Sequence, residues 1–487
     1  MKTIFILLFS VLFFCKFSFT QTNPGLSFGG TNNDCGYSLC LTNDQGYLLA
    51  GTTRSYGKGS EDLYLIKLNE FGHLNWSETY GGSHQDFVRS IIPSDDAYIL
   101  IGDQWIDFSK RTDIKMIKIN SVGERIWEIS FGTNNDEKGF KVLETSYGNL
   151  IILGYSRGFD DPGDIFIIKT DAEGNQLWQN HYGYEMDDYG LDIVENDDGS
   201  LMIFGTKNGF FNDVHVNFRV PDADMFLLKI DENGNELWRQ EYGAEGHDFG
   251  YALNKSVSGG YFLFGSTQSY GAGSFDMCLI KIDENGSLIW QKTYGGEHYE
   301  YGLSIDNNES GDLFLLGCTK SFGENGSVDY YLIKTDSLGN PIWELTIGGD
   351  MADNGNKVLA TIEGGCVVIG SSESFGSGGS DMLVAKVNQY GMIENLYDDI
   401  NSKYSNQLVI APNPIHQTGR IILDDNNPST SKVLELTSAN GVFVKQYILT
   451  LPNFTFDVSG LPAGIYVYKL SDTNKTTNEY RGKLIVY

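Results

Sequence analysis

Acidic residues recur at two fixed positions in this sequence, and carboxylates spaced in this way could bind cations. One follows a repeated aromatic–Gly or Ile–Gly step, and the other precedes a repeated Lys by five residues. Carboxylate oxygens are the ligands that Ca²⁺ prefers, so the two sets could form a cation-binding ring. The alternative, which we favour, is that each carboxylate accepts hydrogen bonds from backbone N–H groups of a turn. A residue that is present in every repeat is expected to support the structure that all repeats have in common. The first set is Asp34, Asp86, Glu137, Asp188, Asp248, Glu300 and Asp353; the second is Asp62, Asp113, Asp164, Asp224, Asp276, Asp329 and Asp381.

The remaining motifs do not combine into a catalytic, metal or cofactor site. Asp231–Gly234 and Asp283–Gly286 resemble calcium loops but lack the later ligands and the terminal Glu, so we interpret them as hairpin turns. His84, His247 and His298 lack metal-ligand spacing, and no Ser/His/Asp order can be assigned. An Asp-x-x-Gly-x-x-x-Trp pattern is similar to the tryptophan repeat of quinoprotein dehydrogenases, but it is one residue short and lacks their cysteine pair. We predict no catalytic residue, no metal and no cofactor.

The charge of the chain limits its partners. The 487 residues include 34 basic and 64 acidic residues, which gives a formal charge of −30. Nucleic acids and anionic membranes bind positive surfaces, so neither is an expected partner. An acidic surface is also a general means of keeping a protein soluble, and we give that interpretation the larger weight.

Residues 1–20 have the features of a secretory signal peptide. Lys2 provides the charged start, Ile4–Cys15 the apolar run, and Ser18-Phe19-Thr20 the cleavage pattern before Gln21. The run is shorter than the roughly 20 residues that a membrane-spanning helix needs, and no later stretch is apolar and long enough. We expect an exported mature chain without a transmembrane segment.

The cysteines after residue 20 show no functional pattern. They are odd in number and scattered, without C-x-x-C spacing, so neither a disulfide framework nor a zinc site is predicted. Cys278, Cys318 and Cys366 lie in apolar runs and are expected to be buried.

A unit of about 50 residues is repeated seven times, at spacings of 51, 51, 60, 52, 53 and 52 residues. A period of this length indicates one supersecondary unit in tandem. Within residues 300–349, apolar runs at Tyr301–Asn307, Leu313–Cys318, Tyr330–Thr335 and Pro341–Ile347 alternate with turns. Six units carry a Trp in the last run, which we interpret as core packing between units: Trp76, Trp127, Trp178, Trp238, Trp290 and Trp343.

Four antiparallel strands per unit indicate an all-β protein, with a seven-bladed β-propeller over residues 21–398. The seventh unit has Asn395 where the Trp is expected, and Pro24–Gly30 matches only the second half of that strand. We therefore expect the N-terminal segment to supply the outer strand of the last blade and close the ring, which removes exposed strand edges.

The composition changes after a linker at residues 399–408, where glycine becomes rarer and Thr, Val and Leu become more frequent. Residues 409–487 read as a small β-sandwich (Ig-like) domain, with hairpin signals at Asn440-Gly441 and Ala463-Gly464.

This tail resembles the C-terminal sorting domain (type A) of the type IX secretion system. The Pro-Asn-Pro opening, the Asn-Gly hairpin, the Asp-Val-Ser-x-Leu-Pro-x-Gly-x-Tyr core and a basic residue before an apolar end match that family in order. The resemblance implies export across the outer membrane, partnership with the secretion machinery, and removal of the tail by a sortase-like peptidase, after which the protein is released or attached to the surface. The motif residues are Pro412, Asn413, Pro414, Asp457, Leu461, Pro462, Gly464, Tyr466 and Lys483.

Ligand-binding residues are predicted in the loops that precede the strand-opening Asp residues. Four loops follow one formula, Ser-(Tyr/Phe)-Gly…Gly-Ser, and the loops of units two, three and four depart from it. Aromatic planes beside Arg and Asn suit a sugar ring or a protein anchor. The alternative interpretation, that the insertion is a surface loop that packs on itself, has equal weight. The candidates are Trp105, Phe108, Arg111, Arg157, Phe159, Phe210, Phe211, His215, Phe218 and Arg219.

The sequence therefore favours a non-catalytic binding module or scaffold outside the cell, with a glycan or protein ligand. The alternatives are an exported propeller enzyme acting on polysaccharide, a quinoprotein-like oxidoreductase, and a purely structural surface layer.

Overall fold

The computed structural model divides the chain into two compact units, residues 1–398 and 399–487, and each is described by itself. The residues that the structure describes are 24–107, 111–158, 162–183, 186–208 and 223–394 in the first unit, and 408–411, 418–423, 432–438, 442–449, 455–462, 464–472 and 479–486 in the second.

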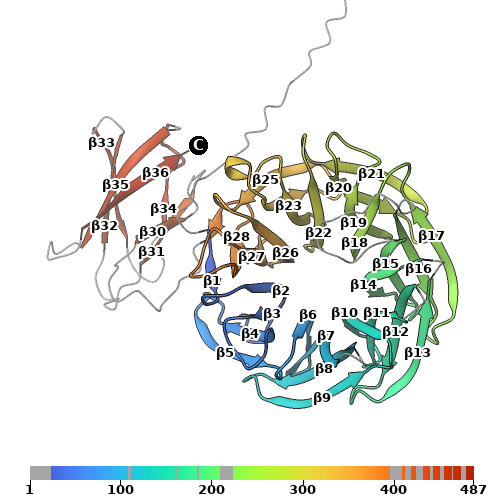
Figure 1. The fold of residues 1–487 in the computed structure, drawn as a ribbon. Helices are drawn as coiled ribbons and strands as arrows, with labels where there is room; N and C mark the ends of the chain where they lie inside the picture. Colours follow the sequence, from blue (N-terminus) through green and yellow to red (C-terminus); the bar gives the residue numbers. More distant parts are fainter. Residues whose placement is uncertain are drawn as a thin grey trace, which may run out of the picture. The chain divides into compact units, whose positions relative to one another are not determined.

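The described part of the first unit consists of antiparallel sheets that stand side by side around one axis, with the first strand of each repeated unit innermost (Figure 1). Repeated four-stranded sheets of this kind are the units of a β-propeller, so the all-β prediction is confirmed. The sheets are β2 (Asp34–Leu41), β3 (Tyr47–Thr53), β4 (Asp62–Leu68), β5 (Leu74–Tyr80); β6 (Asp86–Ser94), β7 (Ala97–Asp107), β8 (Arg111–Asn120), β9 (Arg125–Phe131); β10 (Asp136–Glu144), β11 (Leu150–Arg157), β12 (Gly163–Thr170), β13 (Gln176–Tyr182); β14 (Tyr189–Glu195), β15 (Leu201–Lys207), β16 (Asp224–Ile230), β17 (Glu236–Tyr242); β18 (Asp248–Lys255), β19 (Tyr261–Thr267), β20 (Asp276–Ile282), β21 (Leu288–Tyr294); β22 (Glu300–Asn307), β23 (Leu313–Thr319), β24 (Asp329–Thr335), β25 (Pro341–Ile347); and β26 (Asp353–Ala360), β27 (Cys366–Ser372), β28 (Asp381–Val387) with β1 (Leu26–Phe28) and β29 (Ile393–Glu394).

The last of these sheets is completed by the N-terminal segment. β1 pairs antiparallel with β28, with Leu26 opposite Val384, while the short β29 pairs with the other end of β28. Leu26 is buried at this junction. The expectation that residues 24–30 supply an outer strand to the last unit is therefore confirmed.

The repeated Trp and the aromatic residue four positions later fasten neighbouring sheets together. The indole of Trp238 lies over Gly286 in the outer turn of the next sheet, and the Tyr242 hydroxyl donates to the Gly286 carbonyl at 2.7 Å. Gly286 has a φ of 85°, which the turn requires and which glycine adopts without strain. Each Trp packs against the core from its edge and is half-buried, because an outer strand has only one covered face, so the core assignment was too strong. The same contacts join Trp178 and Tyr182 to Gly234, and Trp290 and Tyr294 to Gly339.

Every inner strand of the described residues contains a shift of register, a β-bulge, near its middle. In β2 the register shifts between Gly36 and Ser38, and Gly36 lies opposite Gly51. A β-carbon on Gly51 would lie 2.0 Å from the Cys35 carbonyl oxygen, which explains why this strand position is glycine. Bulges redirect side chains at the centre of a ring of sheets. The equivalent shifts are Val88/Ser90, Gly139/Lys141, Gly190/Asp192, Gly250/Ala252, Gly302/Ser304 and Gly355/Lys357.

The core lies between adjacent sheets and is formed mainly by their second and third strands. Every residue of β3, β4, β19, β20, β23 and β24 is buried. Cys278, Cys318 and Cys366 are buried free thiols in these strands and in β27, as predicted.

The described part of the second unit consists of two small antiparallel sheets, whose inward side chains include Leu434, Leu436, Phe456, Tyr466 and Tyr468. Asn440 and Gly441 lie outside the described residues, and the strands that flank them, Lys432–Ser438 and Phe443–Leu449, pair antiparallel. The sheets are β30 (Leu408–Ala411), β31 (Thr418–Leu423), β34 (Thr455–Asp457); and β33 (Phe443–Leu449), β32 (Lys432–Ser438), β35 (Gly464–Asp472), β36 (Glu479–Val486).

The hairpin expected at Ala463-Gly464 is wrong. The strands on either side, β34 and β35, belong to different sheets, because a turn closed by the Leu461 N–H and the Val458 carbonyl carries the chain between them. The Tyr466 hydroxyl donates to the Pro462 carbonyl at 2.6 Å, and the Asp457 carboxylate accepts the Ser459 N–H at 2.8 Å. The Asp457–Tyr466 motif is thus a connection held by its own hydrogen bonds. Lys483 lies in β36, and Pro412, Asn413 and Pro414 lie outside the described residues.

Candidate binding site on the connection face

The loops with the predicted ligand-binding residues open on the same face as the connections between sheets. The Asp86 N–H, at the start of β6, donates to the Glu61 carbonyl at the end of the preceding loop. The Glu300 N–H makes the same bond to the Phe275 carbonyl. We call this surface the connection face, and the opposite surface, which carries the hairpin turns, the turn face.

The loops that follow the Ser-(Tyr/Phe)-Gly formula are fixed to the neighbouring connection. The Ser55 hydroxyl accepts the Asn32 N–H at 3.0 Å and donates to Asp34 at 2.6 Å. Ser374 repeats both contacts with Met351 and Asp353. The Ser of the formula therefore has a structural role, because it links the loop to the neighbouring connection by hydrogen bonds.

The repeated carboxylates accept backbone N–H bonds, as the favoured interpretation predicted. In the first set, the carboxylate of Glu300 accepts the N–H of Gly296, four residues earlier, at 2.8 Å. In the second set, Asp62 accepts the N–H groups of Lys58 and Gly59, both at 2.8 Å. Equivalent bonds reach Asp34, Asp86, Glu137, Asp248, Asp353, Asp276, Asp329 and Asp381.

Carboxylates of the two sets meet in pairs where sheets adjoin, on either side of the Gly of the aromatic–Gly step. A β-carbon on Gly295 would lie 2.0 Å from Asp276 Oδ1 and 2.5 Å from Glu300 Oε2. All four carboxyl groups of the Asp276–Glu300 and Asp34–Asp381 pairs are almost fully buried. The Gly is therefore required because the carboxylates occupy the space of a side chain. Comparable approaches occur at Gly29, Gly81 and Gly243.

Proximity of two buried acids makes one of them harder to ionise. Burial, together with the charge of Asp353, raises the pKa of Asp329 to about 6, against hydrogen bonds from Ser327 and the Glu324 N–H that lower it. The unfolded pKa of Asp is about 3.9, so the folded protein holds this proton more tightly. The stability that this group contributes is complete below about pH 4 and is lost as the pH rises through about 6.

Replacing Asp329 with Asn should therefore flatten the pH dependence of stability. The wild type should lose about 2 kcal/mol more of its free energy of unfolding between pH 4.5 and 7.5 than the D329N variant, because Asn has no proton to lose. Urea unfolding at both pH values measures the difference. Equal slopes in the two proteins would contradict the paired-acid account.

The structure describes three of the ten predicted ligand-binding residues. Trp105 and Arg111 share the β7–β8 hairpin, where Arg111 has a φ of 60° and lies opposite Asp107. Arg157 ends β11 in the next sheet, and its exposed guanidinium lies 3.6 Å from Asp187. Phe108, Phe159, Phe210, Phe211, His215, Phe218 and Arg219 lie outside the described residues.

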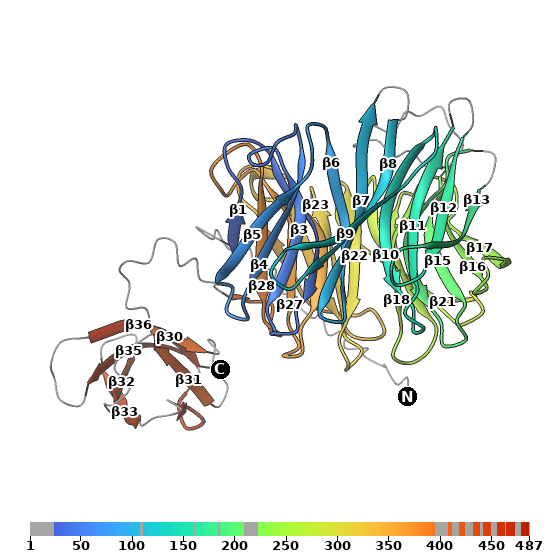
Figure 2. The same cartoon turned by 90° about the horizontal axis from the view of Figure 1, so that it is seen from below.

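The β7–β8 hairpin is longer than its counterparts. β7 has 11 residues and β8 has 10, against seven in most second and third strands. Figure 2 shows this hairpin reaching beyond the other strands on the connection face. Trp105 and Arg111 therefore lie on a projecting β-ribbon. The departure from the loop formula drew attention to these residues but did not predict the ribbon.

Sequence reasoning missed two groups of aromatic side chains near the inner strands. In the first, Tyr155 and Tyr189 stack with ring centroids 4.6 Å apart, and the Tyr155 hydroxyl donates to Asp187, the partner of Arg157. In the second, Phe275 lies 5.6 Å from Phe249 and 5.4 Å from Tyr301. A detectable signal existed, because an aromatic residue directly follows the repeated acid in several units.

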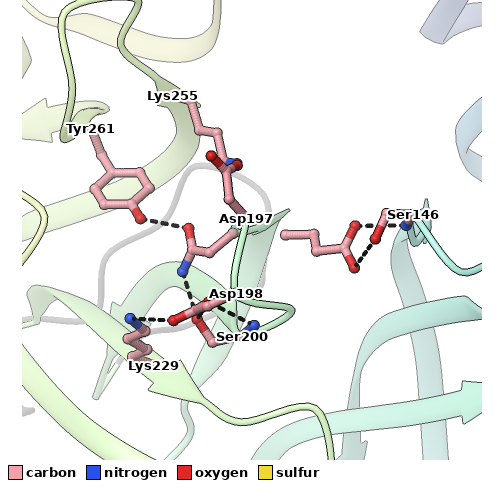
Figure 3. A network of polar contacts seen from close by, with 9 residues as sticks. Ser146, Asp197, Asp198, Ser200, Lys229, Lys255 and Tyr261 are labelled. Atoms are coloured by element: carbon pink, nitrogen blue, oxygen red, sulfur yellow. Dashed lines mark hydrogen bonds and ion pairs between the residues drawn. The ribbon is translucent and has the colours of Figure 1, made fainter.

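On the turn face, polar side chains connect three adjacent sheets (Figure 3). The turn between β14 and β15 is at the centre of this network: Glu195 accepts the Ser146 N–H at 2.7 Å, and Asn196 accepts the Tyr261 hydroxyl at 2.5 Å. Asp197 pairs with Lys255 at 3.2 Å and Asp198 with Lys229 at 3.6 Å. Exposed pairs contribute roughly 0–1 kcal/mol each, so we interpret this network as a structural tie.

Among the residues that the structure describes, no three His, Cys, Asp or Glu side chains are grouped so that they could hold a metal ion. Within the same residues, no helix has the length and apolar character that crossing a membrane requires.

The chain has distant relatives. The regulatory protein FlaEY of Caulobacter vibrioides is 25% identical over 372 residues, which cover 70% of this chain and 35% of that protein. The chain thus spans about a third of the length of this curated relative.

Among solved structures, a polysaccharide lyase described as an ulvan lyase is 10% identical with a TM-score of 0.46, covering 75% of this chain and 97% of that one. The Pan2 WD40 domain of Neurospora crassa is 11% identical with a TM-score of 0.40, covering 62% and 83%. At these values neither likeness bears on activity.

The second unit has a defined family. Residues 409–487 match the model of the secretion system C-terminal sorting domain. This agrees with the resemblance carried by the Asp457–Tyr466 connection and the basic residue Lys483 near the end. Residues 409–487 are therefore a type IX secretion C-terminal sorting domain, which directs the chain across the outer membrane to the cell surface or the extracellular space.

Proposed function

We propose that this protein is an exported, non-catalytic binding module or scaffold whose ligand, a glycan or a protein, binds the connection face over the second, third and fourth sheets. In this proposal residues 21–398 are a closed seven-bladed propeller, 399–408 a linker, 409–487 an Ig-like sorting domain, and 1–20 a signal peptide. A sortase-like peptidase removes the tail after export.

The observation that carries the proposal is the contrast between two kinds of loop on one face. Where the formula is kept, Ser hydroxyls bind the neighbouring connection. Where it is not kept, the β7–β8 ribbon projects with Trp105 and Arg111, and Arg157 is positioned on the next sheet by Asp187. Asp187 is itself held by the Tyr155 hydroxyl and by the Gly163 N–H at 2.6 Å.

This arrangement suits recognition of a sugar ring or a protein side chain. An aromatic plane supplies apolar contact area at low conformational cost, and a guanidinium held by a carboxylate offers oriented donors. The repeated carboxylates are engaged by backbone N–H groups, which favours a structural role for them over acid–base chemistry.

A glycan and protein array, probed with the mature chain, tests the proposal. Once a ligand is found, replacing Trp105, Phe210 and Phe211 together with Ala should weaken binding by about tenfold or more while leaving the melting temperature nearly unchanged. Tyr270→Ala is the matched control, because Tyr270 is an exposed aromatic residue in a loop that keeps the formula.

Turnover of a polysaccharide or a redox dye, lost on mutation of one loop residue, would instead establish an enzyme. Unchanged affinity in the triple variant would remove the connection-face site.

A further inference from the structure

The inner strands surround the axis of the ring (Figure 1), and each contributes one residue directly after its bulge at the same level of its sheet. This level is set by the register, since Ser38 lies opposite Ala50 and Lys141 opposite Leu153. We call these residues the axial layer. They are Ser38, Ser90, Lys141, Asp192, Ala252, Ser304 and Lys357.

Serine at this position has a structural role. The Ser38 hydroxyl accepts the Ile91 N–H of the next inner strand at 3.2 Å, and Ser304 accepts the Val358 N–H at the same distance. Asp192 replaces serine in this role, with its carboxylate accepting the Leu253 N–H at 3.0 Å. A lysine ammonium has no acceptor, so Lys141 and Lys357 cannot accept the backbone N–H of the next inner strand. They are departures from the repeat.

Lys141 lies in β10 and Lys357 in β26, two inner strands on opposite sides of the axis (Figure 1). Lys141 Nζ lies 2.7 Å from Asp192 Oδ1. Lys357, in the last sheet, is half-buried. Its burial and the charge of Lys141 lower its pKa to about 8, against Asp192 and Asp306, which act to raise the pKa. Within the described residues, no hydrogen bond or ion pair joins the Lys357 ammonium to a protein group.

The nearby carboxylates contact groups other than the Lys357 ammonium. Asp192 already bonds Lys141 and the Leu253 N–H. Asp306 accepts the Ala360 N–H at 2.8 Å and the Asn254 amide at 3.2 Å. Among the described residues, the Lys357 ammonium is therefore left without a direct partner, in a chain whose formal charge is −30. An oxyanion placed between two ammonium groups in a partly desolvated site is bound by charge-assisted hydrogen bonds.

We propose that the axial layer is a binding site for a small oxyanion, a sulfate or a carboxylate group, held between Lys141 and Lys357. This site is separate from the connection-face site and does not depend on it. The ligand would be a free anion or the acidic group of a sugar.

Calorimetric titration of the full chain tests the proposal and distinguishes the sources. Sodium sulfate, sodium glucuronate and glucose are the probes, and glucose should not bind. Lys357→Met and Lys141→Met should each weaken anion binding by about tenfold or more, since each removes one charged partner. Lys255→Met, which removes a lysine on the turn face, should bind as the wild type does. Binding of glucuronate but not sulfate would assign the ligand to acidic sugars.

A second measurement does not depend on whether the variants fold. In the wild type with ¹³C-methylated lysines, sulfate should raise the pKa of Lys357, because the anion stabilises its charged form. Lys357→Arg, which keeps the charge, should retain binding. An unchanged Lys357 pKa at saturating sulfate, or equal affinities in all three Met variants, would overturn the proposal.

Discussion

Replacing Gly81 with Ala should lower the free energy of unfolding by about 3 kcal/mol, whereas the same change at Gly82 should alter it by less than about 0.5 kcal/mol. A β-carbon on Gly81 would lie 1.9 Å from Asp62 Oδ1 and 3.0 Å from Asp86 Oδ2. At Gly82 the nearest atom, the same Asp86 oxygen, would be 4.0 Å away. The two neighbours are therefore a matched pair that differ in the space around the new methyl group.

Asp62 cannot move aside cheaply. Its other oxygen accepts the N–H groups of Lys58 and Gly59, and the residue is buried, so a displaced carboxylate would leave these donors without a partner. Urea unfolding of the two variants beside the wild type measures the effect. If both variants were equally stable, the carboxylate would not be held against the glycine, and the account of the aromatic–Gly step would fail.

Much of the architecture could be predicted from the sequence because one unit is written seven times. In residues 300–349 the predicted and observed strand ends agree to within a residue or two. Glu300 and Asp329 open strands that the sequence predicts to begin one residue later. The incomplete strand at Pro24–Gly30 predicted how the last sheet is completed. Repetition averages out local ambiguity, since a turn residue that recurs at one offset must serve the common fold.

Contacts between units were harder to predict. The sequence presents Trp238, Tyr242 and Gly286 as separate recurrences, and only the structure shows that the first two bind the third. The pairing of Asp276 with Glu300 was also hidden, because these residues open strands in different sheets. Such contacts depend on the rotation between sheets, which strand patterns do not specify.

The candidate site was predictable only as a contrast. The departure of three loops from the formula indicated the sector, and Trp105 and Arg111 do lie on the connection face. It could not give the length of the β7–β8 hairpin, since that depends on a pairing that continues to Asp107 and Arg111. The sequence analysis also did not predict the axial layer. Lys141 and Lys357 carry no recognisable pattern in the sequence, and only the bulges of β10 and β26 place them at one level.

The sorting domain carries the second large effect. A chain that ends at Ser402 lacks residues 409–487, which match the sorting-domain model, but retains the strands β1 to β29. Because these strands hydrogen-bond only to one another among the described residues, the first unit should still fold. It should accumulate in the periplasm in a protease-resistant form, since the signal for passage across the outer membrane is gone.

The most direct measurement is the distribution of this shortened chain between periplasm, cell surface and medium, compared with the full chain and with the Tyr270→Ala variant as an exported control. We expect the full chain and the control outside the outer membrane, and the shortened chain folded and almost entirely in the periplasm. Normal amounts of the shortened chain at the surface or in the medium would contradict the account.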